Sequence, residues 1–149
     1  MPVTAEGRPV RNASGIGAHL NIAVVFTNSE GTAAALRTAG ALASRLNGRV
    51  TVFAPVEVSW RLPVEQPPVS PEWNRRRFEA LASECPVETT VRLFFCRDAW
   101  EILRRVLSPN SLVVVGGRKH WWTREGRLMR RLRALGHHVV LAEMEQNNG

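Results

Sequence analysis

Five short apolar runs alternate along this chain with four stretches of helical periodicity, and this alternation limits the possible folds more than any other feature. The apolar runs lie at residues 22–26, 50–54, 87–96, 112–115 and 138–142. The helical stretches lie at residues 32–47, 71–84, 99–107 and 123–135. Strands that alternate with helices build an α/β fold with a mainly parallel sheet, and right-handed crossovers put helices on both faces. The sequence therefore predicts a three-layer α/β sandwich around a five-stranded sheet.

Local patterns refine this prediction at one strand and one connection. In the run at 87–96, the side chains that would share one face are Val87, Thr89, Val91, Leu93 and Phe95. Such alternation is typical of a strand with one solvated face, so we expect this strand at an edge of the sheet. Residues 55–71 contain five of the nine prolines of the chain and predict an irregular excursion.

The inner faces of two helices follow from apolar residues spaced three and four apart. In the stretch 32–47 the apolar stripe consists of Leu36, Ala39, Ala43 and Leu46. In the stretch 123–135 it consists of Leu128, Leu132 and Leu135, with Met129 beside them. We expect both stripes to pack on the sheet.

A single domain at residues 21–143 fits the length of 149 residues, with a flexible tail at 1–20 and a polar tail at 144–149. No apolar run approaches the roughly 20 residues that span a bilayer, and the first residues lack the apolar core of a signal peptide. We therefore expect a cytoplasmic protein with no membrane partner. Cys85 and Cys96 match no zinc spacing and are expected to be reduced and inert, and the four histidines suggest no metal site.

Positive charge is concentrated at residues 118–133, where seven basic side chains oppose only Glu125 and carry +6 of the formal net charge of +7. This basic segment has three interpretations. It is a solvated face, a surface for a polyanion such as a nucleic acid or an acidic protein, or a site for a small phosphorylated ligand. In the third case the helix amino terminus near Thr123 would act together with Arg118 and Lys119.

Four segments resemble the universal stress protein family, and the likeness extends over about residues 20–143. The opening strand and turn at 21–30, the Ala99-x-x-Ile102-Leu103 pattern, the strand at 112–116 and the strand at 138–141 follow the family's order. The resemblance implies a Rossmann-like, adenine-nucleotide α-hydrolase-like sheet with strand order 3-2-1-4-5. It also implies a homodimer along the fifth strand, for which Val139, Val140 and Leu141 would form the edge.

The chain departs from the family's nucleotide motif, which is G-x2-G-x9-G-[ST] after the fourth strand. Gly116 and Gly117 are followed by arginine, lysine, histidine and two tryptophans, and the second loop glycine is absent. Thr27 stands where the family has an aspartate, whereas Ser29 is retained. We therefore predict a degenerate nucleotide site that Trp121 and Trp122 fill, or at which they form a contact. The alternative is that these tryptophans are a stacking platform for a base.

The leading hypothesis is a non-catalytic, dimeric regulatory or stress-response domain that binds a partner or an anionic ligand, with no cofactor. The predicted ligand-binding residues are Thr27, Ser29, Gly116, Gly117, Arg118, Lys119 and Arg127. One alternative is a universal stress protein that binds ATP, and another is a protein that binds nucleic acid or other polyanions. A hydrolase built on Ser29, Asp98 and His120 is a further alternative, but Ser29 lacks a G-x-S-x-G nucleophile elbow.

Overall fold

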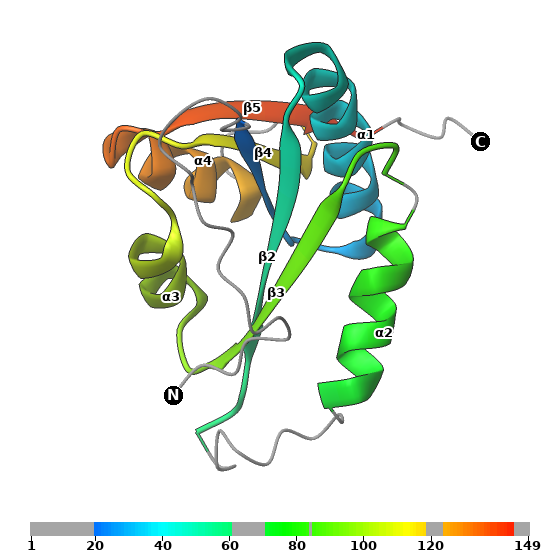
Figure 1. Cartoon of the computed structure of the whole chain (residues 1–149). Coiled ribbons are helices and arrows are strands. Elements are labelled where there is room, and N and C mark those ends of the chain that lie inside the picture. Colours follow the sequence, from blue (N-terminus) through cyan, green and yellow to red (C-terminus); the bar gives the residue numbers. More distant parts are fainter. Residues whose placement is uncertain (1–19, 61–70, 84, 119–123, 145–149) are drawn as a thin grey trace, which may run out of the picture.

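The computed structural model of the chain describes residues 20–60, 71–83, 85–118 and 124–144 (Figure 1). Within these ranges five strands alternate with four helices, as predicted. The strands are β1 (Asn21–Val25), β2 (Arg49–Glu57), β3 (Thr89–Cys96), β4 (Leu112–Gly117) and β5 (His138–Glu143). The helices are α1 (Ser29–Leu46), α2 (Pro71–Ala82), α3 (Ala99–Val106) and α4 (Arg124–Ala134). Most of both predicted tails, and the loop segment with Lys119, Trp121 and Trp122, lie outside the described residues.

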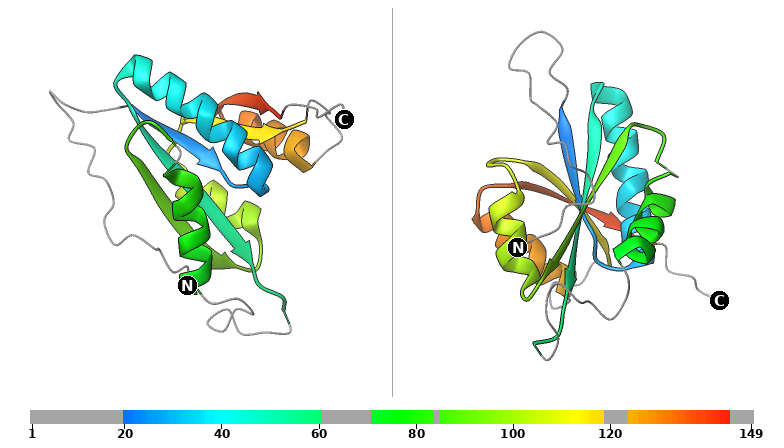
Figure 2. Two further views of the ribbon diagram at one scale, coloured as in Figure 1. Left: turned by 90° about the vertical axis from the view of Figure 1, so that its right-hand side faces the viewer. Right: turned by 60° about the horizontal axis from the view of Figure 1, so that its bottom comes forward.

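The five strands form one parallel sheet in the order β3-β2-β1-β4-β5, which confirms the order that the family resemblance implies. Helices α1 and α2 cover one face and α3 and α4 cover the other, as both views in Figure 2 show. Successive side chains of a strand point to opposite faces, so Ile22 and Val24 of β1 enter the first core while Ala23 and Val25 enter the second. In the described part of the chain, no helix is long and apolar enough to cross a membrane.

The predicted edge position of β3 is confirmed, but its predicted solvated face is wrong. Phe94 points to the face opposite Leu93 and is only 1% exposed. Helix α3 follows β3 directly and packs across β2 and β3 on this side. The guanidinium of Arg92 lies over the rings of Phe53 and Phe94 and covers them further. The apolar side chain of Phe94 interrupts the alternation because α3 covers the face of β3 that was predicted to be solvated.

The excursion predicted to begin at Pro55 starts later, because β2 continues to Glu57 and pairs with β3 up to that residue. The N–H groups of Val50 and Val58 donate to the carbonyls of Glu88, just before β3, and of Cys96, at its end, so the nitrogen of Pro55 faces the other neighbour, β1. Pairing with β1 ends at Phe53. Because no β1 carbonyl lies opposite Pro55, its missing N–H removes no hydrogen bond from the sheet, and the strand continues through it.

The predicted stripes are correct at their centres and wrong at their ends. Leu36, Ala39 and Ala43 are buried on the sheet, as is Leu132 of α4. Leu46 is 53% exposed and Leu135 is 49% exposed. An 18-residue helix is about 27 Å long and a five-residue strand is about 17 Å long, so the last turn of α1 overhangs the sheet. Leu135 lies in the turn between α4 and β5.

Candidate functional site

Two of the helices that begin at the carboxyl edge of the sheet, α1 and α3, have a polar cap. Asn28 caps α1, and its side-chain oxygen accepts the N–H of Gly31 at 2.7 Å. Asp98 caps α3 and accepts the N–H of Trp100 at 2.9 Å. Helix α1 therefore begins at Ser29, three residues before its predicted start, because the Asn28 cap organises the first turn. The carboxyl edge of an open parallel sheet is where ligands bind in such folds.

Gly116 and Gly117 are the last two residues of β4, which continues two residues past the apolar run predicted at 112–115. A Cβ atom on Gly116 would lie 1.6 Å from the carbonyl oxygen of Gly31 in α1. The hydroxyl of Thr27 donates to the carbonyl of Gly116 at 3.1 Å, while the N–H of Thr27 donates to Thr32 Oγ1. Gly116 thus allows α1 to approach β4 closely, and Thr27 ties β1 to the same point.

Two hollows open at this edge, and we name them by their position and chemistry. The α1 hollow has a volume of about 370 Å³ and is lined by Asn28, Ser29, Glu30, Gly117, Arg118, Glu125 and Met144. The arginine pocket has a volume of about 670 Å³ and lies between α3, α4 and the ends of β1 and β2. Its lining includes Phe26, Thr27, Pro55, Glu57, Asp98, Trp100, Arg124, Arg127 and Arg131. Asn28 and Glu125 line both hollows.

The arginine pocket has a cationic wall and an apolar wall. Arg124, Arg127 and Arg131 project from α4 at helical spacing and form the cationic wall. Phe26, Pro55 and the indole of Trp100 contribute apolar surface. The guanidinium of Arg131 lies 5.5 Å from the ring centroid of Trp100, so the two walls meet at this pair. The pocket therefore suits a ligand with a flat apolar part and an anionic group.

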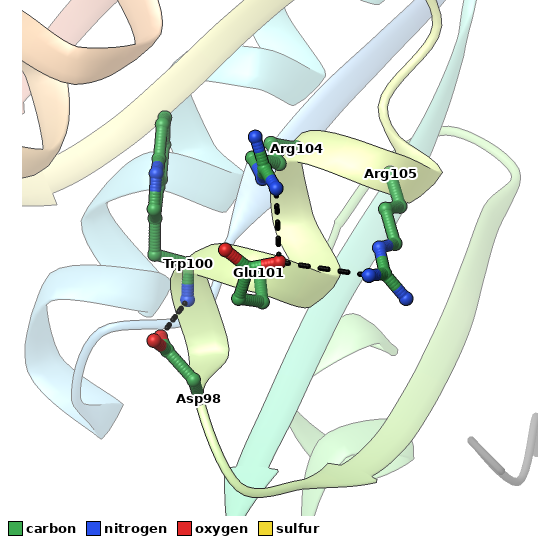
Figure 3. A network of polar contacts seen from close by, with 5 residues as sticks. All are labelled: Asp98, Trp100, Glu101, Arg104 and Arg105. Atoms are coloured by element: carbon green, nitrogen blue, oxygen red, sulfur yellow. Dashed lines mark hydrogen bonds and ion pairs between the residues drawn. The ribbon is translucent and has the colours of Figure 1, made fainter.

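The arginines of the pocket wall keep their charge available. Across the described residues, ion pairs form between Arg49 and Glu88 and between Glu101 and the arginines at 104 and 105. Figure 3 shows that one carboxylate oxygen of Glu101 contacts both arginines. Two of the three carboxylates that line the pocket accept backbone N–H groups, since Glu57 accepts that of Ala99 and Asp98 accepts that of Trp100. No described carboxylate forms an ion pair with the α4 wall.

Ser29 is held toward α2 by an arginine. Arg77 Nη2 donates to Ser29 Oγ at 2.9 Å. The guanidinium of Arg77 also lies within 5.3 to 5.7 Å of the ring centroids of Phe26, Trp73 and Phe78. Ser29 lines the α1 hollow and Asp98 lines the arginine pocket, so the two residues of the hydrolase alternative face different hollows. His120, its third member, lies outside the described residues.

The predicted ligand-binding residues are divided between the two hollows. Thr27 and Arg127 line the arginine pocket, whereas Ser29, Gly117 and Arg118 line the α1 hollow. Gly116 is buried and lines neither of these hollows, and Lys119 lies outside the described residues. Sequence reasoning missed Phe26, Pro55, Glu57 and Trp100, whereas Arg131 belongs to the predicted basic segment at 118–133. The four missed residues share a position, since they lie at the ends of β1 and β2 or at the start of α3.

The thiols and imidazoles of the described residues are not arranged for metal binding or for nucleophilic attack. No group of three potential ligands occurs among the residues that the structure describes. Burial, with the nearby charges of Glu57 and Asp98, raises the pKa of the Cys96 thiol to about 11. His137 is buried, and its Nδ1 accepts the N–H of Ser111 at 3.1 Å. Burial lowers the pKa of His137, which keeps the imidazole neutral.

Strand β5 forms the other edge of the sheet and contains the predicted dimer residues. Val139, Val140 and Leu141 are half-buried and pack into the two cores. The N–H groups of His138 and Met144 point to β4, so those of Val139 and Leu141 point outward. Arg133 Nη2 donates to the outward carbonyl of Val139 at 3.3 Å. Within the described residues, Arg133 thus covers this edge at Val139.

Three solved structures with similar folds are universal stress proteins. A universal stress protein in complex with cAMP matches with a TM-score of 0.50 and 15% identity, over 85% of this chain and 98% of that one. A universal stress protein from Archaeoglobus fulgidus matches with a TM-score of 0.53 and 13% identity, over 83% and 93% of the two chains. A member of the family from Burkholderia pseudomallei matches with a TM-score of 0.52 and 19% identity, over 83% and 95%. No protein-family model and no curated protein matches the sequence. The chain has the fold of the universal stress proteins.

Proposed function

We propose that the chain is a cytoplasmic, non-catalytic regulatory domain of the universal stress protein type, which binds a small anionic ligand in the arginine pocket. The main observation behind this proposal is that Arg124, Arg127 and Arg131 line the same pocket as the apolar surface around Trp100. The pocket has a volume of about 670 Å³. A volume of roughly 300–1,000 Å³ is typical of small-molecule sites. The planar guanidinium fork matches phosphate oxygens better than other side chains do.

A nucleoside monophosphate or cyclic nucleotide is the ligand class to test first. Its phosphate matches the α4 wall, and its base matches the flat apolar side formed by Phe26, Pro55 and Trp100. One protein with the same fold was solved in complex with cAMP. The triphosphate of ATP needs a longer glycine-lined cradle, and the sequence after Gly117 has lost the second loop glycine. We therefore propose that ATP binds more weakly than a nucleoside monophosphate or a cyclic nucleotide.

The proposal of a non-catalytic domain is supported by the state of the nucleophiles near the pocket. The thiol of Cys96 is protonated near neutral pH because its pKa is raised to about 11. The hydroxyl of Ser29 accepts from Arg77 in the other hollow. Neither group is activated by a neighbouring base in the described residues. We expect no turnover on panels of phosphoester and ester substrates, and measurable turnover that depends on Ser29 would overturn this part of the proposal.

Isothermal titration with cAMP, AMP, inorganic phosphate and Mg-ATP tests the binding proposal. We expect cAMP or AMP to bind and Arg127→Ala to weaken that binding about tenfold or more, the effect of losing one charged hydrogen bond. Arg45→Ala is the matched control, because Arg45 is an exposed arginine in the last turn of α1, at the far end of that helix. Failure of all four compounds to bind below about 1 mM would refute the proposal. Micromolar binding of Mg-ATP, tighter than that of AMP, would favour the ATP-binding alternative.

We further propose that two copies pair along β5. The N–H groups of Val139 and Leu141 point outward, and no described strand pairs with β5 on that side, so a second β5 would satisfy them. Sedimentation equilibrium should show a dimer, and hydrogen exchange should show that these two amides become protected as concentration rises. A monomer at about 100 µM, well above the Kd of a stable dimer, would refute pairing at this edge.

A further inference from the structure

The three tryptophans in the described part of the chain all lie at the carboxyl edge, each beneath an arginine. Arg97 lies 5.0 Å from the ring centroid of Trp60, and Arg131 lies 5.5 Å from that of Trp100. Trp73 has Arg77 at 5.7 Å, on α2 and therefore on the opposite face of the sheet. The first two pairs form what we call the Trp–Arg row, which consists of Trp60, Arg97, Trp100 and Arg131.

Backbone contacts hold the two halves of this row together. Arg97 Nη1 donates to the carbonyl of Val58 at 3.2 Å and also to that of Ser59. Arg97 directly follows β3, so these hydrogen bonds hold the segment before Trp60 against the end of that strand. Glu57 Oε1 accepts the N–H of Ala99 at 3.0 Å, which ties the end of β2 to the first turn of α3. Trp100 is the next residue and points into the arginine pocket. The row therefore runs from β2 across β3 and α3 to α4.

Trp60 is an unusual side chain to leave in water. It is 81% exposed even though a guanidinium covers one face of its ring, so the other face is open. It does not line the arginine pocket, and no small ligand within that pocket explains it. An open indole face backed by a cation is a platform for a nucleic-acid base, because every base presents a π face and the arginine adds a cation–π contribution.

The charge beyond the row matches a phosphate backbone. Helix α4 carries five arginines against one glutamate, and its Arg127 and Arg124 follow Arg131 along the pocket wall. The remaining carboxylate near the start of α3, Glu101, is neutralised by the arginines at 104 and 105 (Figure 3). The surface thus combines stacking positions at Trp60 and Trp100 with the three arginines of the α4 wall, which share the pocket with the carboxylates of Glu57, Asp98 and Glu125.

We propose that the Trp–Arg row and the α4 wall bind single-stranded nucleic acid, with one base on Trp60, one at Trp100 and the phosphates along α4. A single strand is required because a base in a duplex has no free face to stack. This inference shares Arg127 and Arg131 with the proposed ligand pocket but does not depend on mononucleotide binding. Trp60 is the residue that separates the two functions.

Fluorescence anisotropy with labelled 12-nucleotide oligo(dT) and oligo(U), and with a 12-base-pair duplex, tests the proposal. We expect both single strands to bind more tightly than the duplex, with log K falling against log salt by about 0.7 for each phosphate contacted, or about 2 for three arginines. Trp60→Ala should weaken single-strand binding about 5- to 100-fold, the effect of losing one stacked base. Trp60→Phe should restore most of it. Preference for oligo(U) over oligo(dT) would identify RNA as the source of the strand.

Trp73→Ala is the matched control, since it removes an exposed tryptophan beneath an arginine on the other face. It should leave oligonucleotide affinity unchanged, and Trp60→Ala should leave cAMP or AMP affinity unchanged. No binding of either single strand at 50 mM salt, equal effects of Trp60→Ala and Trp73→Ala, or a salt slope near zero would each overturn the inference. If oligonucleotides bind and mononucleotides do not, the result would support this inference and refute the proposed binding of a small ligand in the arginine pocket.

Discussion

Replacing Gly116 with alanine should push α1 away from the sheet. The new Cβ would lie 1.6 Å from the carbonyl oxygen and 2.4 Å from the carbonyl carbon of Gly31. This is about 2 Å short of an ordinary van der Waals contact. Both atoms belong to backbone, so no side-chain rotation relieves the overlap and the first turn of α1 must move. Small-to-large changes in packed cores cost about 1–3 kcal/mol and occasionally more, and we expect about 3 kcal/mol or more here.

Gly117→Ala provides the control one residue away on the same strand. Its Cβ would lie 2.7 Å from Cγ and 3.0 Å from Cβ of Glu125, so the overlap is milder than at Gly116 and involves side-chain atoms and no backbone. We expect a cost of about 1 kcal/mol, the energy of a displaced rotamer. Urea denaturation followed by tryptophan fluorescence would give both values, and Gly116→Ala should lower Tm by about 6–12 °C. A loss for Gly116→Ala within about 0.5 kcal/mol of the control would refute the close-contact argument.

Three further predictions concern a cap, a histidine and the sheet edge. Asn28→Ala should destabilise the protein by about 0.5–2 kcal/mol in urea denaturation, because the first turn of α1 loses its side-chain acceptor. Burial lowers the folded-state pKa of His137 below its ordinary 6.5, so the stability from the neutral ring is present above about pH 6.5 and is lost as pH falls from there through the folded-state pKa. His137→Asn, which keeps an acceptor for the N–H of Ser111 but does not titrate, should flatten the dependence of unfolding free energy between pH 7.5 and 5.0. Arg133→Ala should tighten dimerisation about 2- to 10-fold in sedimentation equilibrium, because the outward carbonyl of Val139 is freed to pair with a second strand.

Each of these has a defined contrary result. Asn28→Asp keeps an acceptor and should be nearly neutral, so equal losses for the aspartate and alanine variants would argue against a capping role. Parallel pH curves for His137→Asn and the unchanged protein would mean that another group titrates. An unchanged dimer constant in Arg133→Ala would place the dimer interface away from β5.

The fold could be predicted because its main signals are local. Continuous apolar runs identified β1 and β4, and glycine and asparagine marked the end of α1 at Asn47, which adopts a left-handed φ of 53°. The errors arose where tertiary contacts decide the outcome. Whether β2 passes Pro55 depends on where β1 stops, and whether Phe94 is covered depends on the path of α3. Neither fact is encoded near the residue concerned.

The candidate site was predicted only in part, for a related reason. Thr27 and Arg127 were predicted because they lie in a strand-end turn and in the basic segment, and both line the arginine pocket. Glu57 and Trp100 were missed because they lie more than 40 residues apart and meet only through the pairing of β2 with β3. The predictions that Trp121 and Trp122 occupy a nucleotide cleft remain predictions.

The end of β2 has a mechanical consequence. Beyond Phe53 this strand is paired on one side only, so β2 and β3 project past the rest of the sheet as a two-stranded ribbon that carries Pro55 and Glu57. Two-stranded ribbons reach larger twists than wide sheets. We therefore expect the mouth of the arginine pocket to widen and narrow by ribbon torsion while both cores stay packed. Access of a ligand to the pocket would then depend on the stiffness of the four residue pairs that join β2 and β3 beyond Phe53, and would not require a helix to unfold.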